Sequence, residues 1–273
     1  MNPDRLEPKE LARRARVHAL RMVARARAPH IGTCLSMADL LAVLYSRVLR
    51  FDPADPLAGE RDRFVLSKGH GAAILYAILA ESGFFPVGDL EAYCSDGSNL
   101  AGHASHAVPG VEVSTGSLGH GLPIGAGMAL ATRDDPSAPR VFVLVGDGEL
   151  DEGSNWEAML FAATHELERL VVIVDRNGLQ GFGRCEEVMR LEPLAEKLRA
   201  FGWATVEIDG HDLGSIEAAL SAVPLHPGRP TAIVARTTKG KGVVFMEDRI
   251  EWHYRSPDPV QLAEALAGLG EGP

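Results

Sequence analysis

Two polar turns contain the side chains best suited to carry chemistry. Asp147 lies between two glycines directly after the apolar run 141–145, and Asn177 follows the apolar run 170–174. A carboxylate, an amide oxygen and free carbonyl groups at a strand end suit a hard cation such as Mg²⁺ or Ca²⁺. Glycines that lead into a helix also offer N–H donors to phosphate groups. The residues therefore indicate a site for a metal-bridged diphosphate.

The same turns allow a simpler interpretation. Asp-Gly and Asn-Gly pairs often do no more than close turns after buried strands, and the residues alone leave this possibility open. A Rossmann dinucleotide site fits less well, because residues 146–153 read Gly-Asp-Gly-Glu-Leu-Asp-Glu-Gly and do not match G-x-G-x-x-G.

A strand–helix–strand unit must position these turns. Residues 141–145 and 170–174 are short, β-branched apolar runs typical of strands buried on both faces. Between them a helix is predicted, and its apolar face contains Trp156, Met159, Leu160, Ala163 and Leu167. A right-handed crossover makes the two strands parallel, so Asp147 and Asn177 are expected to face each other at one edge of the sheet.

Composition limits the class of protein. The 273 residues suit one large α/β domain or two small ones, and hydrophobic and charged contents of 46% and 23% are typical of a globular enzyme. The net charge of −10 argues against nucleic-acid binding. Three widely spaced cysteines favour a reducing compartment. With no signal-peptide or membrane-spanning pattern, we expect a cytoplasmic protein that does not bind membranes.

The first half of the chain contains further predicted elements. A basic amphipathic helix is expected over 7–27, ending before Pro29, and Ser36 is predicted to cap a helix that continues to about Leu49. A strand at 63–66 leads into Ser-Lys-Gly-His-Gly and a helix at 72–81, and a glycine-rich loop at 114–121 leads into a helix at 123–131.

The second half continues the alternation of helix and strand. We expect a helix at 192–201, a strand at 204–208, a helix at 215–222 capped by Asp212, and a strand at 231–235. Lys239 and Lys241 are interpreted as members of a solvated loop. The predicted fold class is therefore α/β, with a parallel sheet flanked by helices on both faces.

Several of these motifs together resemble the transketolase family. GDGELDEGSNWEA, followed by Asn177 in a D-x-N context, is similar to the thiamine diphosphate signature, and HIGTCLSMADLL, SKGHG and TTKGKGVVFM with a downstream Trp-His occur in the family's order. The resemblance implies that the Asp147 and Asn177 side chains and the Leu179 carbonyl bind Mg²⁺ (or Ca²⁺). It also implies that the Gly148 amide, beside Gly146, reaches the cofactor diphosphate.

The resemblance assigns four histidines to the site. His30 and His103 would contact the sugar, His70 the cofactor phosphate, and His253 both the diphosphate and the substrate. His103 stands in Gly-His-Ala-Ser-His where the family commonly has Gly-His-Pro-Glu. A zinc site at His103 and His106 is disfavoured, because companion ligands at suitable spacing are missing.

Four more positions have implied contacts with the cofactor. Gly116 and Leu118 would pack on the aminopyrimidine, while Glu152 and Glu157 match family glutamates near the cofactor and the subunit boundary. Glu157 has a second interpretation that stays open, because Ser154-x-x-Glu157 also fits a capping box at a helix start.

The family comparison also indicates what this chain does not contain. Residues 1–255 resemble the diphosphate-binding domain alone, followed by a linker and short helix at 256–273. In full transketolases a second domain binds the pyrimidine and supplies a catalytic glutamate. The resemblance therefore implies the N-terminal subunit of a split transketolase. It would form a heterotetramer with a C-terminal subunit, and that assembly would contain two copies of this chain.

The implied reaction is transfer of a two-carbon ketol unit from a ketose phosphate to an aldose phosphate. Three alternatives remain: the α subunit of a 2-oxo acid dehydrogenase, which also carries GDG and a later Asn; a 1-deoxyxylulose 5-phosphate synthase-like enzyme; and a cofactor-binding or regulatory half without catalysis of its own. Ser-Lys-Gly-His-Gly and the Thr-Thr-Lys-Gly-Lys-Gly segment favour transketolase.

Overall fold

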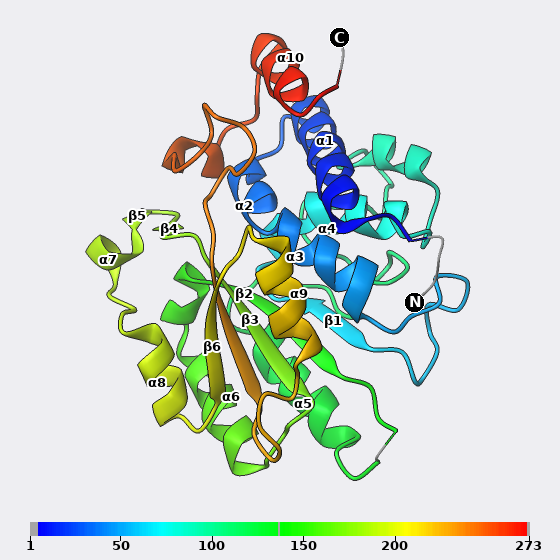
Figure 1. Cartoon of the computed structure of the whole chain (residues 1–273). Helices are drawn as coiled ribbons and strands as arrows, with labels where there is room; N and C mark the ends of the chain where they lie inside the picture. The colour runs from blue at the N-terminus through cyan, green and yellow to red at the C-terminus, as the bar shows by residue number, and fades with distance from the viewer. Residues whose placement is uncertain (1–4, 136, 272–273) are drawn as a thin grey trace.

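A five-stranded parallel sheet forms the centre of the molecule in the computed structural model, which describes residues 5–135 and 137–271. The strands lie in the order β1-β2-β3-β7-β6 (Figure 1). Their bounds are β1 Arg63–Leu66, β2 Val141–Gly146, β3 Leu170–Arg176, β7 Thr231–Arg236 and β6 Ala204–Asp209. The five predicted strands are confirmed to within two residues at each end.

The register of the two central strands brings the polar turns together. β2 and β3 are parallel and fully buried, and Gly146 pairs with Asp175 at their carboxyl ends. Asp147 and Asn177 therefore leave the sheet at the same edge, as the crossover argument predicted. Because ligands of open α/β sheets bind beyond the carboxyl ends of the strands, this edge is where a site is expected.

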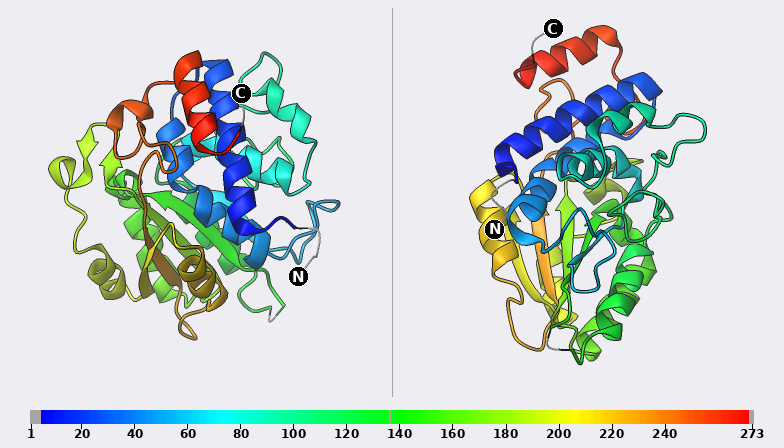
Figure 2. Two further views of the ribbon diagram at one scale, coloured as in Figure 1. Left: turned by 45° about the horizontal axis from the view of Figure 1, so that its top comes forward. Right: turned by 90° about the vertical axis from the view of Figure 1, so that its right-hand side faces the viewer.

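Helices cover both faces of the sheet, which confirms the predicted fold class. On one face, helices α1 (Pro8–Ala26), α2 (Ile31–Ser36), α3 (Ala38–Val43), α4 (Ala72–Glu81) and α9 (Leu213–Ser221) share a core with Phe142, Leu144 and Ile173. On the other, helices α5 (Gly121–Ala131), α6 (Gly153–Thr164) and α8 (Leu194–Ala200) share one with Val143, Val145 and Val172. Figure 2 shows the sheet between these layers.

Short elements complete the chain. They are a π-helical turn η1 (Leu44–Val48), the 3₁₀ turns η2 (Gly69–Gly71), η3 (Val87–Ala92), η4 (Gly148–Asp151) and η5 (Ile250–His253), the hairpin β4 (Leu179–Gln180) and β5 (Gly183–Arg184), and helices α7 (Cys185–Val188) and α10 (Pro259–Gly268). Helix α10 packs against α1, remote from the sheet (Figures 1 and 2). No helix within the described ranges is both long and apolar enough to span a membrane.

The role predicted for Ser36 is wrong. Ser36 is the last residue of α2, and α3 begins after Met37 with no side-chain cap. Its hydroxyl lies 2.5 Å from Asp175 Oδ2, to which it donates, and 3.0 Å from the Thr33 carbonyl oxygen. A buried hydroxyl needs a hydrogen-bonding partner, and here a carboxylate on β3 provides a stronger one than a helix terminus would.

The predicted apolar face of α6 is only partly correct. Asn155, Ala158, Met159 and Ala162 form its buried side, whereas Leu160 is 54% exposed. The capping box is also absent, since the Ser154 hydroxyl donates instead to the Gly119 carbonyl at 2.7 Å. Glycine loop 114–121 therefore competes with the helix terminus for this side chain.

The predicted cap of α9 is confirmed, because the Asp212 side chain accepts a hydrogen bond from the Gly214 amide. At the end of the chain, Asp258 and Gln261 form a full capping box on α10. The division into segments 1–255 and 256–273 stays a prediction, and residues 1–4 and 272–273 of those segments lie outside the described residues.

Candidate active site

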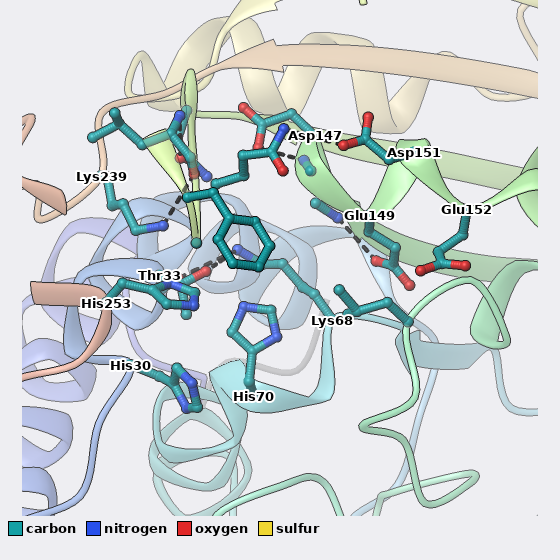
Figure 3. A pocket seen from close by; sticks show the side chains of 18 of the residues that line it. His30, Thr33, Lys68, His70, Asp147, Glu149, Asp151, Glu152, Lys239 and His253 are labelled. Atoms are coloured by element: carbon teal, nitrogen blue, oxygen red, sulfur yellow. Dashed lines mark hydrogen bonds between the residues drawn. The ribbon is translucent and has the colours of Figure 1, made fainter. Parts of the chain in front are cut away.

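A cavity of 480 Å³ lies beyond the carboxyl ends of β2 and β3. Among the residues that line it are nearly all of the sequence-predicted site residues: His30, His70, His103, Gly116, Leu118, Gly146, Asp147, Gly148, Glu152, Asn177, Leu179 and His253. Figure 3 shows His30, His70 and His253 along one side of the cavity and Asp147, Glu149 and Glu152 along another.

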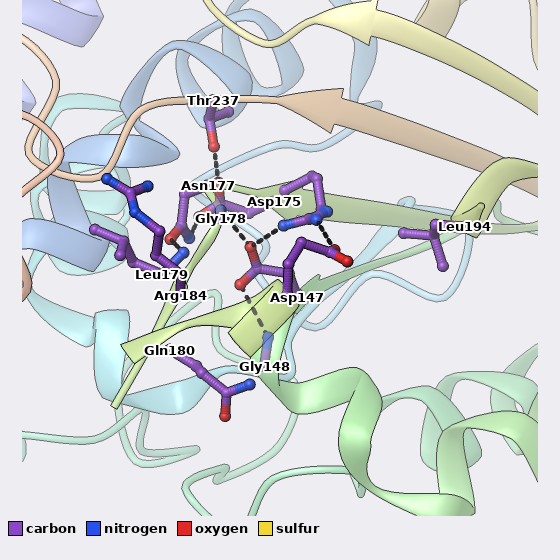
Figure 4. A network of polar contacts seen from close by, with 12 residues as sticks. Asp147, Gly148, Asp175, Asn177, Gly178, Leu179, Gln180, Arg184, Leu194 and Thr237 are labelled. Atoms are coloured by element: carbon purple, nitrogen blue, oxygen red, sulfur yellow. Dashed lines mark hydrogen bonds and ion pairs between the residues drawn. The ribbon is translucent and has the colours of Figure 1, made fainter. Parts of the chain in front are cut away.

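Asp147 is in direct contact with the turn that contains Asn177. Its Oδ2 accepts from the Gly178 amide at 2.6 Å and from Arg176 Nη1 at 3.3 Å, while Oδ1 accepts from the Gly148 amide at 2.9 Å. The Leu179 amide donates to Asn177 Oδ1 at 3.2 Å. Figure 4 shows the two turns facing each other, as the sequence predicted.

The donor set of these turns fits a hard divalent cation. Asp147 supplies a carboxylate, Asn177 an amide oxygen and Leu179 a backbone carbonyl, and all three residues border the same cavity. Such a site leaves places for phosphate oxygens and water, which Mg²⁺ usually retains. This site contains a single carboxylate. It is therefore a different kind of metal site from a cluster of three or more His, Cys, Asp or Glu side chains, and the described residues contain no such cluster that could hold a metal ion.

The electrostatics of Asp147 agree with this fit. Burial raises the pKa of its carboxyl group, and the nearby charge of Asp175 raises it further. A cation between the two turns would favour the ionised carboxylate and so oppose both effects. The ion pair with Arg176, a residue that sequence reasoning missed, already does so in part.

A buried ion pair between Lys68 and Asp175 supports the floor of the cavity. Lys68 Nζ donates to Asp175 Oδ2 and, at 2.8 Å, to Thr33 Oγ1, and the two charged side chains are 1% and 0% exposed. Although burial opposes it, the Lys68 ammonium group keeps the pKa of Asp175 below its ordinary value. Sequence reasoning missed both residues, although Lys68 stands inside the Ser-Lys-Gly-His-Gly motif.

The interpretation of Lys239 as a solvated residue is wrong. The residue is 2% exposed, lines the cavity, and donates from Nζ to the Leu179 carbonyl at 3.0 Å. Burial lowers the pKa of this lysine to about 8, and the charge of Lys68 acts in the same direction. Lys241 does remain at the surface, with a side chain 39% exposed near Glu247. In the sequence Lys-Gly-Lys, the side chain of Lys239 is therefore buried at the cavity and that of Lys241 lies at the surface.

Glu149 is another residue that sequence reasoning missed, and it connects three segments of the cavity wall. Its Oε1 accepts from the Ser67 hydroxyl at 2.5 Å and from the Gly119 amide at 2.9 Å, and its Oε2 accepts from the Gly146 amide at 3.0 Å. Its position in Gly-Asp-Gly-Glu could have identified it, because a buried carboxylate at a turn must accept hydrogen bonds from donors inside the protein. Burial raises the pKa of its carboxyl group.

Four histidines gather at the cavity from four separate segments. The His30 ring centroid lies 5.1 Å from that of His70, 5.9 Å from His103 and 5.0 Å from His253. Burial is the main cause that lowers the pKa of His30 to about 4 and that of His253 to about 3, and it lowers the pKa of His70 well below the ordinary range. These three imidazoles are therefore neutral near pH 7.

Two buried polar atoms at the cavity are without a hydrogen-bonding partner among the described residues. They are His253 Nδ1 and Asp151 Oδ1. Buried polar groups are normally satisfied, so such atoms mark places where a ligand group or water can bind. His253 was predicted as a site residue, and Asp151 was not.

One predicted site residue is not brought to the cavity. Glu157 is exposed on α6 and is absent from the cavity lining, whereas Glu152 lies at the cavity. The two are five positions apart on a helix that begins between them, so their side chains leave it in different directions. His106 was considered with His103 as a zinc ligand, and its Nδ1 lies 2.7 Å from the Ser114 hydroxyl.

A short hairpin and an aromatic pair, neither predicted, flank the cavity mouth. The β4–β5 turn presents Phe182, which is 88% exposed, and Tyr254 Oη donates to the Gly181 carbonyl at 2.5 Å. Tyr254 directly follows His253 in the chain, so this hydrogen bond links the hairpin turn to the segment that carries a cavity histidine.

Comparison with known proteins agrees with this geometry. Residues 8–256 match the family model described as transketolase, thiamine diphosphate binding domain. The chain is 43% identical to one of the subunits of the apulose-4-phosphate transketolase of Actinobacillus succinogenes, over 96% of this chain and 98% of that relative. It is 42% identical to a 6-deoxy-6-sulfo-D-fructose transketolase subunit of a Clostridium species, over 82% of each chain.

A solved structure shows the same fold in a longer protein. The transketolase from Leishmania mexicana superposes with a TM-score of 0.92 at 32% identity, covering 98% of this chain. This chain spans 42% of that transketolase. The chain therefore belongs to the transketolase family, in which it is similar along nearly its whole length to the N-terminal, thiamine diphosphate-binding subunit of split transketolases.

Proposed function

We propose that this chain binds thiamine diphosphate through Mg²⁺ and, with a second subunit, transfers a two-carbon ketol unit from a ketose phosphate to an aldose phosphate. The observation that carries the proposal is the contact between Asp147 and the 176–179 turn, in a cavity that two buried lysines also border. An oxygen-donor set beside positive charge suits a dication together with a diphosphate.

Each part of the cavity would have its own task. Asp147, Asn177 and the Leu179 carbonyl would hold the metal ion, and Lys68, His70, Lys239 and the Gly148 amide would surround the diphosphate. Gly116, Leu118 and Glu152 would border the rest of the cofactor. When bound, thiamine diphosphate supplies the carbon nucleophile that makes and breaks the C–C bond.

The histidines would act on the sugar. His30, His103 and His253 would donate to or accept from substrate oxygens and move protons between them. Neutral imidazole can do both, since one ring nitrogen carries a proton and the other has a free lone pair. The lowered pKa values of His30 and His253 keep these rings neutral while the diphosphate-binding lysines carry the positive charge.

The chain would act together with a partner. Two relatives of similar length are each named as one subunit of an apulose-4-phosphate transketolase, which supports a separate second subunit that supplies the pyrimidine domain with its catalytic glutamate. We propose two copies of each chain in a heterotetramer. Leu160 and Phe161, 54% and 39% exposed on α6, offer apolar surface for such an assembly. Three free cysteines support a cytoplasmic location.

The experiment uses the full chain, purified alone and with the second subunit co-purified from the native cell. Thiamine diphosphate-dependent transfer is measured against a panel of ketose phosphates with an aldose phosphate acceptor. We expect activity only when both subunits are present, with the sugar selected by the assembled site. Activity with pyruvate and a lipoyl acceptor would instead support a 2-oxo acid dehydrogenase.

Asp147→Asn tests the metal site directly. This substitution keeps the size of the side chain but removes its charge, so Mg²⁺-dependent binding of thiamine diphosphate should weaken by at least about 100-fold, the scale on which lost metal-site interactions act. Asp89→Asn, on the exposed η3 turn, is the matched control. Unchanged cofactor affinity in Asp147→Asn would contradict the assignment.

A further inference from the structure

We propose that His211, which does not line the active-site cavity, is a positioning residue that fixes residues 237–239 and thereby aims Lys239 into the cavity. The inference rests on the proposed function, because the role of Lys239 there is to meet the cofactor diphosphate. It assigns a task to Gly210-His211-Asp212, a segment that is otherwise a turn between β6 and α9.

The two ring nitrogens of His211 have different partners. Nδ1 lies 2.8 Å from Asp39 Oδ2, and Nε2 lies 2.8 Å from the Thr238 amide nitrogen. A backbone N–H can only donate, so Nε2 must be the unprotonated nitrogen and Nδ1–H must donate to Asp39. The imidazole is therefore a neutral bridge with a defined tautomer between a carboxylate and a backbone amide.

The carboxylate end of this bridge is held firmly. Arg16 Nη1 and Nη2 bind the two oxygens of Asp39 at 2.9 and 2.7 Å, in a bidentate ion pair between α1 and α3. Although burial opposes it, hydrogen bonds from His211 and Arg16 lower the pKa of Asp39 to about 2. Asp39 thus remains a charged acceptor that orients His211 Nδ1–H across the pH range of folded proteins.

The amide end of the bridge leads into the active site. Beside Thr238, the Thr237 hydroxyl donates to Asp175, and Lys239 Nζ donates to the Leu179 carbonyl at 3.0 Å. Figure 4 shows Thr237 next to Asp175. Three consecutive residues therefore have side-chain contacts with three different groups, and His211 is the partner of the Thr238 amide. Backbone hydrogen bonds also hold the segment, from the Thr237 amide to the Arg176 carbonyl at 3.2 Å and from the Asp248 amide to the Lys239 carbonyl at 2.9 Å.

The turn that contains His211 packs closely against the segment 237–239. A Cβ atom at Gly210 would lie 2.4 Å from Thr237 Cγ2, so the turn packs directly on Thr237 and a side chain at position 210 would displace it. His211 itself borders a separate surface hollow with Arg16 and Asp39. The hydrogen bond from the Thr238 amide to His211 thus holds the backbone next to Lys239 from outside the cavity.

Two substitutions separate the two hydrogen bonds. His211→Gln places an amide oxygen where Nε2 was and can still accept from Thr238, whereas His211→Asn places its amide near Nδ1, bonds Asp39 and leaves Thr238 without an acceptor. His226→Asn, at an exposed histidine bonded to the adjacent Pro227 carbonyl, is the matched control. Asp39 keeps its bidentate ion pair with Arg16 in both His211 variants, so a general loss of folding is not expected.

Two measurements are made on the full-length chain. Hydrogen exchange, followed by NMR, reports whether the Thr238 amide is protected, and titration with thiamine diphosphate and Mg²⁺ reports affinity. We expect His211→Asn to lose Thr238 protection and to bind the cofactor about 3- to 10-fold more weakly, the scale of one lost hydrogen bond. His211→Gln and His226→Asn should stay within about twofold of the wild type.

Equal cofactor affinity in His211→Asn and the wild type would overturn the proposal, as would equal loss in the Asn and Gln variants. Failure of the wild-type chain to bind the cofactor would contradict the proposed function. In that case the hydrogen-exchange data still test the positioning role of His211. An unprotected Thr238 amide in the wild type would overturn this role. Protection that is present in the wild type and lost only in His211→Asn would support it.

Discussion

Lys239 Nζ lies 3.0 Å from the carbonyl oxygen of Leu179, the backbone group proposed to bind the metal. A buried ammonium group therefore stands beside the donor set of the dication, and a diphosphate bridging to that ion would lie within its field. The arrangement places the Lys239 ammonium group in the same cavity as the Asp147 carboxylate, where an anionic ligand would approach the metal site.

Lys239→Met should weaken binding of thiamine diphosphate while the fold is retained. Methionine fills a similar volume without charge, and a charge-assisted hydrogen bond contributes about 1.5 to 3 kcal/mol, so a loss of roughly 10- to 100-fold is expected. Isothermal titration in the presence of Mg²⁺ measures it. Lys241→Met is the matched control, since that side chain is 39% exposed at the surface. Equal affinities in the two variants would refute the role of Lys239.

The strands and the polar turns that follow them could be predicted because both depend on the local sequence. Buried parallel strands need continuous apolar runs, and 141–145 and 170–174 are such runs, so Asp147 and Asn177 could be placed at one edge without coordinates. The cap at Asp212 was predictable for the same reason, since its partner is the amide of Gly214, two residues away.

The errors concern side chains whose partners are distant in sequence. Ser36 carries a good capping signal, yet its hydroxyl bonds Asp175 on β3. Lys239 has the composition of a surface loop, yet it reaches the Leu179 carbonyl of another loop. Leu160 fitted the helical spacing but is 54% exposed, because spacing indicates an apolar stripe and not what covers it.

Acid should destabilise the protein through the active-site histidines. The pKa values of His30 and His253 are lowered to about 4 and about 3, mainly by burial, whereas unfolded histidine titrates near 6.5. As pH falls below 6.5 the unfolded chain binds protons that the folded chain does not, so the free energy of unfolding should decrease. The stabilising contribution is complete above pH 6.5 and declines from there toward pH 3.

Urea denaturation from pH 7 to pH 4 measures this dependence. His30→Asn should reduce the slope of unfolding free energy against pH, because asparagine does not titrate, while His226→Asn at an exposed position should leave it unchanged. An identical slope in His30→Asn and the wild type would show that His30 titrates alike in both states.

Breaking the ion pair beneath the cavity should be costly. Lys68→Met leaves Asp175 buried with its charge supported only by hydrogen bonds from neutral groups, and removing one partner of a buried pair typically destabilises by about 3 to 5 kcal/mol. The double variant Lys68→Met/Asp175→Asn should recover part of that loss, because no unpaired charge remains. Chemical denaturation of the two single variants and the double variant gives the coupling energy. A double variant with the sum of the single losses would contradict the pairing.

Tyr254→Phe should loosen the hairpin at the cavity mouth without changing cofactor binding. The substitution removes only the hydroxyl that donates to the Gly181 carbonyl at 2.5 Å, and the Gly181 position is otherwise held by the two short strands β4 and β5. Trypsin should then cut faster after Arg184, whose ion pair with Asp248 at 2.8 Å is itself largely exposed and therefore weak. In the proposed two-subunit enzyme we expect a higher KM for the sugar phosphate, since Phe182 and the rest of the turn border the cavity that the substrate would enter. Cofactor affinity and thermal stability should stay close to those of the wild type. If the rate of cleavage after Arg184 and the KM both stay unchanged, the hydrogen bond from Tyr254 to Gly181 does not control the hairpin. If cofactor affinity falls as well, the Tyr254 hydroxyl also fixes the turn that contains Leu179, and the hairpin does not move independently of the metal site.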